Sequence, residues 1–316
     1  MAIKIRRLSD IPREEYIVSG HALCPGCGIT PMIRLMLKAI EGPKVVVNAT
    51  GCLEVCTTLY PHTSWKIPWV HNAFENAAAT AAGIEAAVKV LSRKRGWKKY
   101  KVIAIGGDGG TYDIGLQALS GALERWHNFM YICYDNEAYM NTGIQRSGGT
   151  PMGAATTTSP AGRVIPGKPQ PKKDLVAIAA AHRIPYVATI NIAYPTDMWN
   201  KFAKASDILE NEEGPVFMLY LTPCPTGWRM DSSMTIEAAR LAVQTRMFPL
   251  YEIDHGKLRI TVRVAKPKPL EEYLKIQGRF KHLLLPENKE LLESLKKWVE
   301  DNWRRLERLS QLESLY

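Results

Sequence analysis

Four cysteines in this chain have types and spacing that could hold a metal centre. Cys24 and Cys27 lie together in HALCPGCGIT, whereas Cys52 (NATGCLEVC) and Cys224 (TPCPTGW) occur singly. Two residues between the members of the first pair let both sulfur atoms face one centre, as in iron–sulfur proteins. The pair therefore indicates a thiolate-bound metal site, to which distant cysteines could contribute.

Two further cysteines have different expectations. Cys56 is interpreted as a non-ligand, and Cys133, in the middle of MYICYD, as a plain core thiol. An alternative is structural zinc bound by Cys56 together with Cys24, Cys27 and Cys52. We disfavour it because zinc pairs more often have two-residue spacing. Since a chain of 316 residues can build a core without disulfides, its six cysteines favour a reduced compartment.

A glycine-rich turn follows the apolar run KVIAIGG and leads directly into a helical segment. Residues 106–110 read GGDGG, so unpaired backbone N–H groups can point at an anion and the glycines let phosphate come close. The chain has no GxxxxGK(S/T) sequence, and Tyr112 stands where the dinucleotide fingerprint requires a third glycine. The turn therefore predicts a phosphate site of another class.

Asp108 in this turn would repel phosphates unless a cation lay between them. Mg²⁺ is commonly held by one or two oxygen-bearing side chains together with substrate phosphates. The next apolar run, FMYICYD, leads to Asn136, and a βαβ unit returns the chain to the same edge of the sheet. We therefore expect Asp108 and Asn136 to converge on Mg²⁺. The alternative is that both are ordinary turn residues.

These residues would be positioned by an α/β architecture, because strand-like apolar runs alternate with helical patterns. Such alternation is typical of a parallel sheet with right-handed crossovers and helices on both faces. Strands are expected at 44–51, 101–107, 129–136, 186–192 and 215–225, and helices at 29–40, 73–91, 114–126, 174–184 and 195–209.

Two long stretches are expected as loops. One is the aromatic and proline-rich stretch 57–71, and the other is 147–173, which we interpret as a lid or a partner-binding segment. We divide the chain into 1–230, which carries the cofactor and iron–sulfur ligands, and 231–316. The second part is an amphipathic C-terminal extension that would pack on this domain or on partner subunits.

Composition excludes several classes of protein. An apolar fraction of 46% suits a globular core, no run of 18 apolar residues occurs, and no signal-peptide apolar segment follows the charged start. We expect an unexported, cytoplasmic protein that does not enter the membrane. The net charge of +10 comes from short basic runs mixed with acidic residues, without a nucleic-acid motif. It indicates a solvated surface or, alternatively, a docking face for an acidic electron carrier.

The sequence GDGG, followed by DNEAYMNTG with Asn136 lying 28 residues after Asp108, resembles the thiamine-diphosphate motif of the 2-oxoacid:ferredoxin oxidoreductases. With the cysteines included, most of the chain is similar to the thiamine-binding β subunit of that family. The resemblance implies the parallel-sheet thiamine diphosphate-binding fold.

The resemblance also implies roles for individual residues. Asp108, Asn136 and the backbone carbonyl of Ala138 would be Mg²⁺ ligands. Gly107, Gly109 and Gly110 would contact the diphosphate, and Asn141 would occupy a catalytic position near the thiazolium and the substrate. A 4Fe–4S cluster would be held by Cys24, Cys27, Cys52 and Cys224. Val55 and Phe74 would form a wall of the substrate pocket.

The activity implied by the resemblance is oxidative decarboxylation of a 2-oxoacid, with electrons passing through the cluster to ferredoxin and coenzyme A taking the acyl group. The family's catalytic glutamate comes from a second, related domain, and this chain has only one such domain. We therefore expect an obligate complex with subunits of the alpha, gamma and delta type, and no activity from this chain by itself.

TGCLEV and HNAFENAAA look closest to the pyruvate-specific branch, so pyruvate is the first choice of substrate. The alternatives are 2-oxoisovalerate and oxalate. Two alternatives of another kind are a non-redox thiamine enzyme of the acetolactate type and a zinc-stabilised basic interaction protein.

Overall fold

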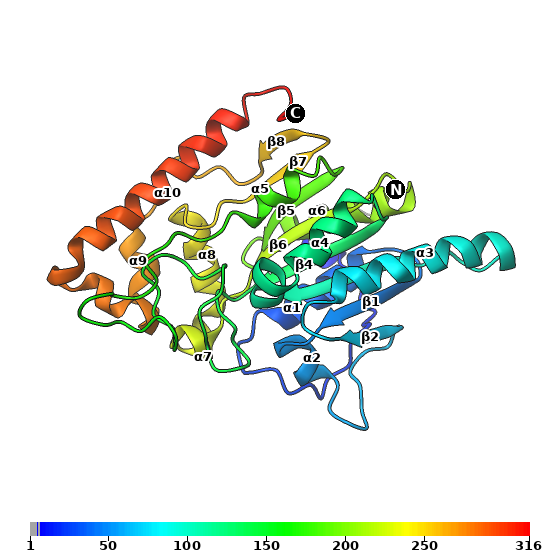
Figure 1. The fold of residues 1–316 in the computed structure, drawn as a ribbon, viewed down its shortest axis with the longest axis horizontal. Helices are drawn as coiled ribbons and strands as arrows, with labels where there is room; N and C mark the ends of the chain where they lie inside the picture. The colour runs from blue at the N-terminus through cyan, green and yellow to red at the C-terminus, as the bar shows by residue number, and fades with distance from the viewer. Residues whose placement is uncertain (1–4, 6) are drawn as a thin grey trace.

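The computed structural model describes residue 5 and residues 7–316. Within them, one sheet runs in the order β2-β1-β3-β4-β6-β5-β7-β8 (Figure 1). The first six of these strands are parallel, β7 is antiparallel to β5, and β8 is antiparallel to β7. The strands are β1 (Lys44–Ala49), β2 (Trp69–Asn72), β3 (Lys101–Gly107), β4 (Phe129–Asp135), β5 (Tyr186–Asn191), β6 (Val216–Leu221), β7 (Tyr251–Asp254) and β8 (Lys257–Ile260).

Helices cover both faces of the sheet, as the sequence predicts (Figure 1). One face carries α1 (Ile29–Ala39) and α6 (Pro195–Glu210), and the other carries α3 (Ala77–Arg95), α4 (Leu116–Glu124), α5 (Leu175–Ala180) and α10 (Lys289–Leu309). The remaining helices are α2 (Cys52–Thr57), α7 (Pro225–Trp228), α8 (Thr235–Gln244) and α9 (Leu270–Lys275). Single turns are η1 (Leu8–Asp10), η2 (Gly109–Ile114), η3 (Ser232–Met234), η4 (Gly278–Leu284) and η5 (Pro286–Asn288).

Two cores sandwich the sheet, because side chains alternate between its faces. In β1, Val45 and Val47 enter one core and Val46 enters the other. β4 and β6 are buried along their whole length, which is why their sequences are continuous apolar runs rather than alternating ones. Each fully buried aliphatic side chain contributes about 1.5–3 kcal/mol to folding.

Three short strands were missed by the sequence analysis. β2 overlaps the end of the stretch 57–71 that was expected to be a loop, which is a correction. Its four residues are too few to show a period of two. β7 and β8 form a hairpin around Gly256, whose φ of +82° suits the turn, so the segment after residue 230 adds two strands to the sheet.

β7 is attached to the sheet through the buried carboxylate of Glu252. Tyr186 Oη donates to it at 2.6 Å, Arg259 Nη2 lies 2.6 Å away and Lys204 Nζ 3.5 Å away. Burial by itself would raise the pKa of Glu252, but the hydrogen bond from Tyr186 and the charges of Lys204 and Arg259 outweigh it. The pKa is therefore lowered from its usual 4.5.

Apart from the Cys24–Cys27 turn, which precedes α1, the segments expected to carry chemistry follow the carboxyl ends of neighbouring parallel strands. Gly51 and Cys52 follow β1, Asp108 follows β3, Asn136 follows β4, and Cys224 follows β6. This is the edge at which open α/β sheets place their ligands. Residues 147–173 contain no helix or strand, as expected. No helix in the described part of the chain is long and apolar enough to cross a membrane.

Candidate active site

Asp108 sits at the junction between β3 and the π-helical turn η2, and its side chain is only 1% exposed. Ser147 Oγ donates to its Oδ2 at 2.5 Å. Burial and the neighbouring Asp135 raise the pKa of Asp108 well above its usual value. Among the described residues no lysine, arginine or histidine forms an ion pair with Asp108, so its charge is available to an added cation.

Two more oxygens meet Asp108 at this point. One terminal atom of the Asn136 amide lies 2.9 Å from Asp108 Oδ1 and 3.0 Å from the backbone oxygen of Ala138. If this atom is the amide nitrogen, it donates a hydrogen bond to both oxygens. If it is the amide oxygen, three hydrogen-bond acceptors face one another. Mg²⁺ binds oxygens at about 2.0–2.1 Å with octahedral geometry, which places adjacent ligand oxygens roughly 2.9 Å apart. The donor set therefore fits Mg²⁺.

A small pocket of about 30 Å³ joins these oxygens to the glycine turn. Its lining includes Thr50, Gly51, Cys52, Phe74, Gly107, Asp108, Gly109, Tyr134, Asn136, Ala138, Tyr139, Met140, Asn141 and Thr142. The Tyr139 ring stacks on Phe74 with centroids 5.7 Å apart, and a Cβ at Gly109 would run into that ring. The Tyr139 ring therefore lies directly against the glycine turn.

Some of the other residues expected at the site lie at the small pocket, and one lies on the surface. Gly110 lies beside this pocket, because a Cβ there would meet the backbone oxygen of Phe74. Asn141 and Cys52 both line the pocket, whereas Val55 does not line it and is 40% exposed. Phe74 is thus brought to the site and Val55 is not.

Five cysteines gather next to this pocket. Burial raises the pKa of Cys27 to about 12, and Cys224, Cys24 and Cys56 add to the shift. Burial likewise raises the pKa of Cys52 to about 12, with contributions from Cys224, Cys27 and Cys56. Thiols that raise one another's pKa lie close together, and ionising several of them requires a positive centre among them. The arrangement fits a cluster of thiolate-bound iron.

Hydrogen bonds and close backbone contacts hold the segments that carry these cysteines. The N–H of Gly227 points at Cys224 Sγ from 3.4 Å, and Tyr220 Oη donates to the oxygen of Gly28 at 2.6 Å. Gly26 has a φ of +73°, and a Cβ there would overlap the carbonyl oxygen of Ser232. The Cys24–Cys27 turn is therefore fixed against the segment that carries Cys224.

Of the two cysteines expected not to be ligands, Cys133 lies apart from this group and Cys56 lies within it. Cys133 is fully buried in β4, which confirms the expected core thiol. Burial, Cys24 and the carboxylate of Glu54 raise the pKa of Cys56, and a nearby negative charge disfavours a thiolate ligand. No three His, Cys, Asp or Glu side chains in the described residues are arranged to hold a metal ion, and this applies to Cys24, Cys27, Cys52 and Cys224 as well as to the zinc alternative with Cys56.

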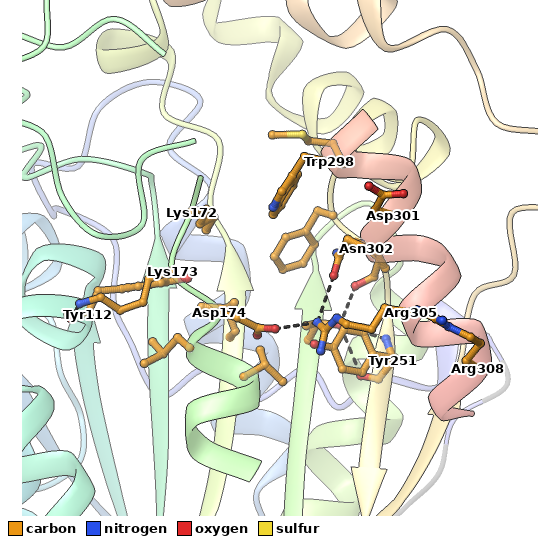
Figure 2. A pocket seen from close by; sticks show the side chains of 17 residues that line it. Tyr112, Lys172, Lys173, Asp174, Tyr251, Trp298, Asp301, Asn302, Arg305 and Arg308 are labelled. Carbon is orange, nitrogen blue, oxygen red and sulfur yellow. Dashed lines mark hydrogen bonds and ion pairs between the residues drawn. The ribbon is translucent and has the colours of Figure 1, made fainter. Parts of the chain in front are cut away.

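A larger pocket, of about 440 Å³, lies between α10 and the sheet (Figure 2). Two of the charged side chains that line it are paired with each other: Arg305 Nη2 lies 2.6 Å from Asp174, and it also lies 3.0 Å from the amide oxygen of Asn302. None of the residues predicted to act on a cofactor lines it. We therefore place the chemistry at the smaller pocket, where the predicted ligands converge.

Sequence reasoning missed several residues that support the site. Ser147 and Thr150 belong to the loop 147–173, and both are buried: Ser147 donates to Asp108 after β3, and Thr150 donates to the backbone oxygen of Glu137 after β4. The first residues of this loop are therefore part of the site, whereas its exposed residues lie at 157–158, 160–165 and 169–171. A serine or threonine in a loop carries no local signal of such a contact.

Comparisons with known proteins agree with this geometry. Residues 49–219 match the family model described as thiamine pyrophosphate enzyme, C-terminal TPP binding domain. The chain is 58% identical to pyruvate synthase subunit PorB of Methanocaldococcus jannaschii, over 94% of this chain and 98% of that protein. It is 48% identical to the PorB subunit of Thermotoga maritima, over 99% and 98% of the two chains.

Two other similarities extend this group. Ketoisovalerate oxidoreductase subunit VorB of Pyrococcus furiosus is 47% identical, over 98% of this chain and 97% of that protein. A solved 2-oxoglutarate:ferredoxin oxidoreductase from Magnetococcus marinus matches with a TM-score of 0.55 and 20% identity, covering 75% of this chain and 84% of that chain. At that identity the match supports the fold.

Proposed function

The chain belongs to the thiamine diphosphate-binding, PorB-type subunits of the 2-oxoacid:ferredoxin oxidoreductases, and we propose that its complex converts pyruvate, coenzyme A and oxidised ferredoxin to acetyl-CoA, CO₂ and reduced ferredoxin. One observation supports this proposal most strongly. The oxygen site at Asp108 and Asn136 lies next to the group of thiols at one edge of the sheet, and Cys52 lines the pocket beside both. The reaction is reversible in this proposal.

In the proposed site, the chain's own residues hold and orient the cofactor. Thiamine diphosphate, when bound, supplies the electron sink that loss of CO₂ from a 2-oxoacid requires. Asp108, Asn136 and the Ala138 carbonyl would hold Mg²⁺ against the diphosphate, since their oxygens already converge. The glycines at 107, 109 and 110 would let the diphosphate approach the backbone.

Asn141 has a distinct place in this proposal. It lines the small pocket together with Cys52, which is the member of the thiol group that reaches this pocket. We assign it to orienting the substrate over the thiazolium. Cys24, Cys27, Cys52 and Cys224 would hold a 4Fe–4S cluster, which supplies a one-electron acceptor when bound. Cys56 is left out because Glu54 lies beside it.

The proposed enzyme is a complex. The sheet of this chain forms one thiamine-binding domain, so the glutamate that activates the cofactor would come from a partner subunit of the alpha type. Subunits of the gamma and delta type would complete the assembly and pass electrons to ferredoxin. The net charge of +10 suits an acidic protein partner.

The second part of the proposal concerns the substrate of the complex. Pyruvate is favoured because the chain is 58% identical to a pyruvate synthase subunit, compared with 47% for a ketoisovalerate oxidoreductase subunit. 2-Oxoisovalerate is therefore the second candidate.

The test is turnover of the purified intact complex with methyl viologen as electron acceptor. Pyruvate, 2-oxoisovalerate, 2-oxoglutarate and oxalate are compared, each with and without coenzyme A. We expect the highest kcat/KM with pyruvate, formation of acetyl-CoA, and no turnover by this chain purified separately. A higher kcat/KM with 2-oxoisovalerate would reassign the substrate. Absence of turnover with every 2-oxoacid, in a complex that contains thiamine diphosphate and iron, would refute the proposed activity.

A further inference from the structure

In the turn that follows β4, the candidate metal ligand Asn136 lies between two residues with buried carboxylates. Asp135 is fully buried and Glu137 is 3% exposed, on either side of Asn136. Glu137 also has a φ of +68°, a left-handed conformation that is costly for a residue with a side chain. The reversal of the chain at Glu137 brings the Ala138 carbonyl back toward Asn136 and Asp108.

Lys172 bridges these two carboxylates from the far end of the loop 147–173. Its Nζ lies 2.6 Å from Asp135 Oδ2 and 2.9 Å from Glu137 Oε1. Burial by itself would lower the pKa of Lys172, but the charges of Asp135 and Glu137 outweigh it and raise that pKa. The ammonium group is thus a fixed positive charge inside the turn, and Figure 2 shows Lys172 at the inner end of the larger pocket.

The other side of the turn is held by the C-terminal part of the chain. Arg279 Nη2 lies 2.5 Å from Glu137 Oε2, and the guanidinium stacks 3.9 Å above the Trp228 ring. Trp228 Nε1 in turn donates to the backbone oxygen of Asn136 at 2.9 Å. Glu137 therefore has two cationic partners, whereas Lys172 is the cation that contacts Asp135 among the described residues.

We propose that Lys172 is a positioning residue for the magnesium site: it holds Asp135 and the left-handed Glu137 in place, so that the Asn136 amide and the Ala138 carbonyl face Asp108. The inference rests on the proposed function, since it assumes that these oxygens bind Mg²⁺ with thiamine diphosphate. Partners in the second layer around metal ligands typically change metal affinity about 10–100-fold when they are removed. Lys172 belongs to that layer, because it touches the neighbours of Asn136 rather than the metal.

The test compares Lys172→Met with wild type in the intact complex, after thiamine diphosphate and Mg²⁺ have been removed. Binding of thiamine diphosphate is followed by calorimetry at a series of Mg²⁺ concentrations. We expect the Mg²⁺ concentration for half-maximal binding to rise about tenfold or more in Lys172→Met. Lys172→Arg, which keeps the charge, should recover most of this loss. The matched control is Lys173→Met, because Lys173 is the next residue, is 38% exposed and pairs with Asp113 at 3.4 Å.

A role in folding without a role in the metal site would lower the melting temperature of the cofactor-free complex and leave the Mg²⁺ requirement unchanged. That result, or an equal effect of Lys173→Met, would overturn the inference. If Lys172→Met does not assemble, the double variant Asp135→Asn with Lys172→Met removes both charges and leaves Glu137 paired with Arg279. It should still need about tenfold more Mg²⁺, and a wild-type requirement would refute the proposal. Failure of the wild-type complex to bind thiamine diphosphate would refute the proposed function instead.

Discussion

The substitution Asp108→Asn should separate cofactor binding from stability. Asp108 is buried beside Asp135, and both burial and that neighbour raise its pKa, so its ionised form is unfavourable until a cation arrives. Asparagine has the same shape, carries no charge and can still accept the hydrogen bond from Ser147. The cofactor-free complex should therefore melt no lower than wild type, whereas its affinity for Mg²⁺ and thiamine diphosphate should fall.

The size of the fall follows from the burial of the site. Removing one partner from a buried charge pair costs about 3–5 kcal/mol. At 1.4 kcal/mol for each factor of ten, the loss in affinity is roughly a hundredfold to a few thousandfold. Since Asp108 is 1% exposed, little of this is screened by solvent.

The assay is calorimetric titration of the cofactor-free complex with thiamine diphosphate at a fixed Mg²⁺ concentration, together with a thermal melt of the same sample. Asp174→Asn is the control, because Asp174 is the N-cap of α5 and asparagine caps helices equally well. Binding by Asp108→Asn within threefold of wild type would refute the assignment of a metal ligand. A parallel loss of binding and melting temperature would refute the electrostatic reasoning.

Three further outcomes are expected. Cys224→Ser should lose visible absorption and bound iron while Cys56→Ser keeps both; equal iron contents in the two variants would contradict the ligand set. Gly26→Ala should destabilise the Cys24–Cys27 turn by about 1–3 kcal/mol, measured as a lower melting temperature and a lower iron content, because its φ is +73° and its Cβ would overlap the Ser232 carbonyl. Glu252→Gln should lower the melting temperature at pH 7, because the folded-state pKa of Glu252 is lowered. Its stabilisation is present above pH 4.5 and disappears as the pH falls through the folded-state pKa, so the difference from wild type should close in acid; a gap independent of pH would contradict this.

Features with a local signal could be predicted from the sequence. The apolar runs that became β1, β3, β4, β5 and β6 are buried on both faces, so their composition identifies them. The glycine turn and Asp108 were also evident, because such a turn between a strand and a helix has few other uses. Short elements such as β2 and α2 have too few residues to establish a period.

Residues that support the site from a distance could not be predicted. Ser147 reaches Asp108 across 39 residues, Lys172 reaches Glu137 across 35, and Arg279 reaches Glu137 across 142. Nothing in the neighbouring sequence of a serine, lysine or arginine reveals such a partner, since the contact depends on the path of the whole chain. The gathering of Cys24 with Cys224 is of the same kind, and was expected only from the family resemblance.

The long-range attachment of the Glu137 turn sets an order of events during synthesis. Arg279 and Trp228 are translated well after the strand that carries Asn136. A ribosome-bound chain that has reached only residue 200 has therefore made Asp108 and Asn136 but lacks the groups that complete their geometry. In the proposed enzyme, magnesium and thiamine diphosphate would therefore be loaded only after the last third of the polypeptide has emerged, and iron only after Cys224 has been made.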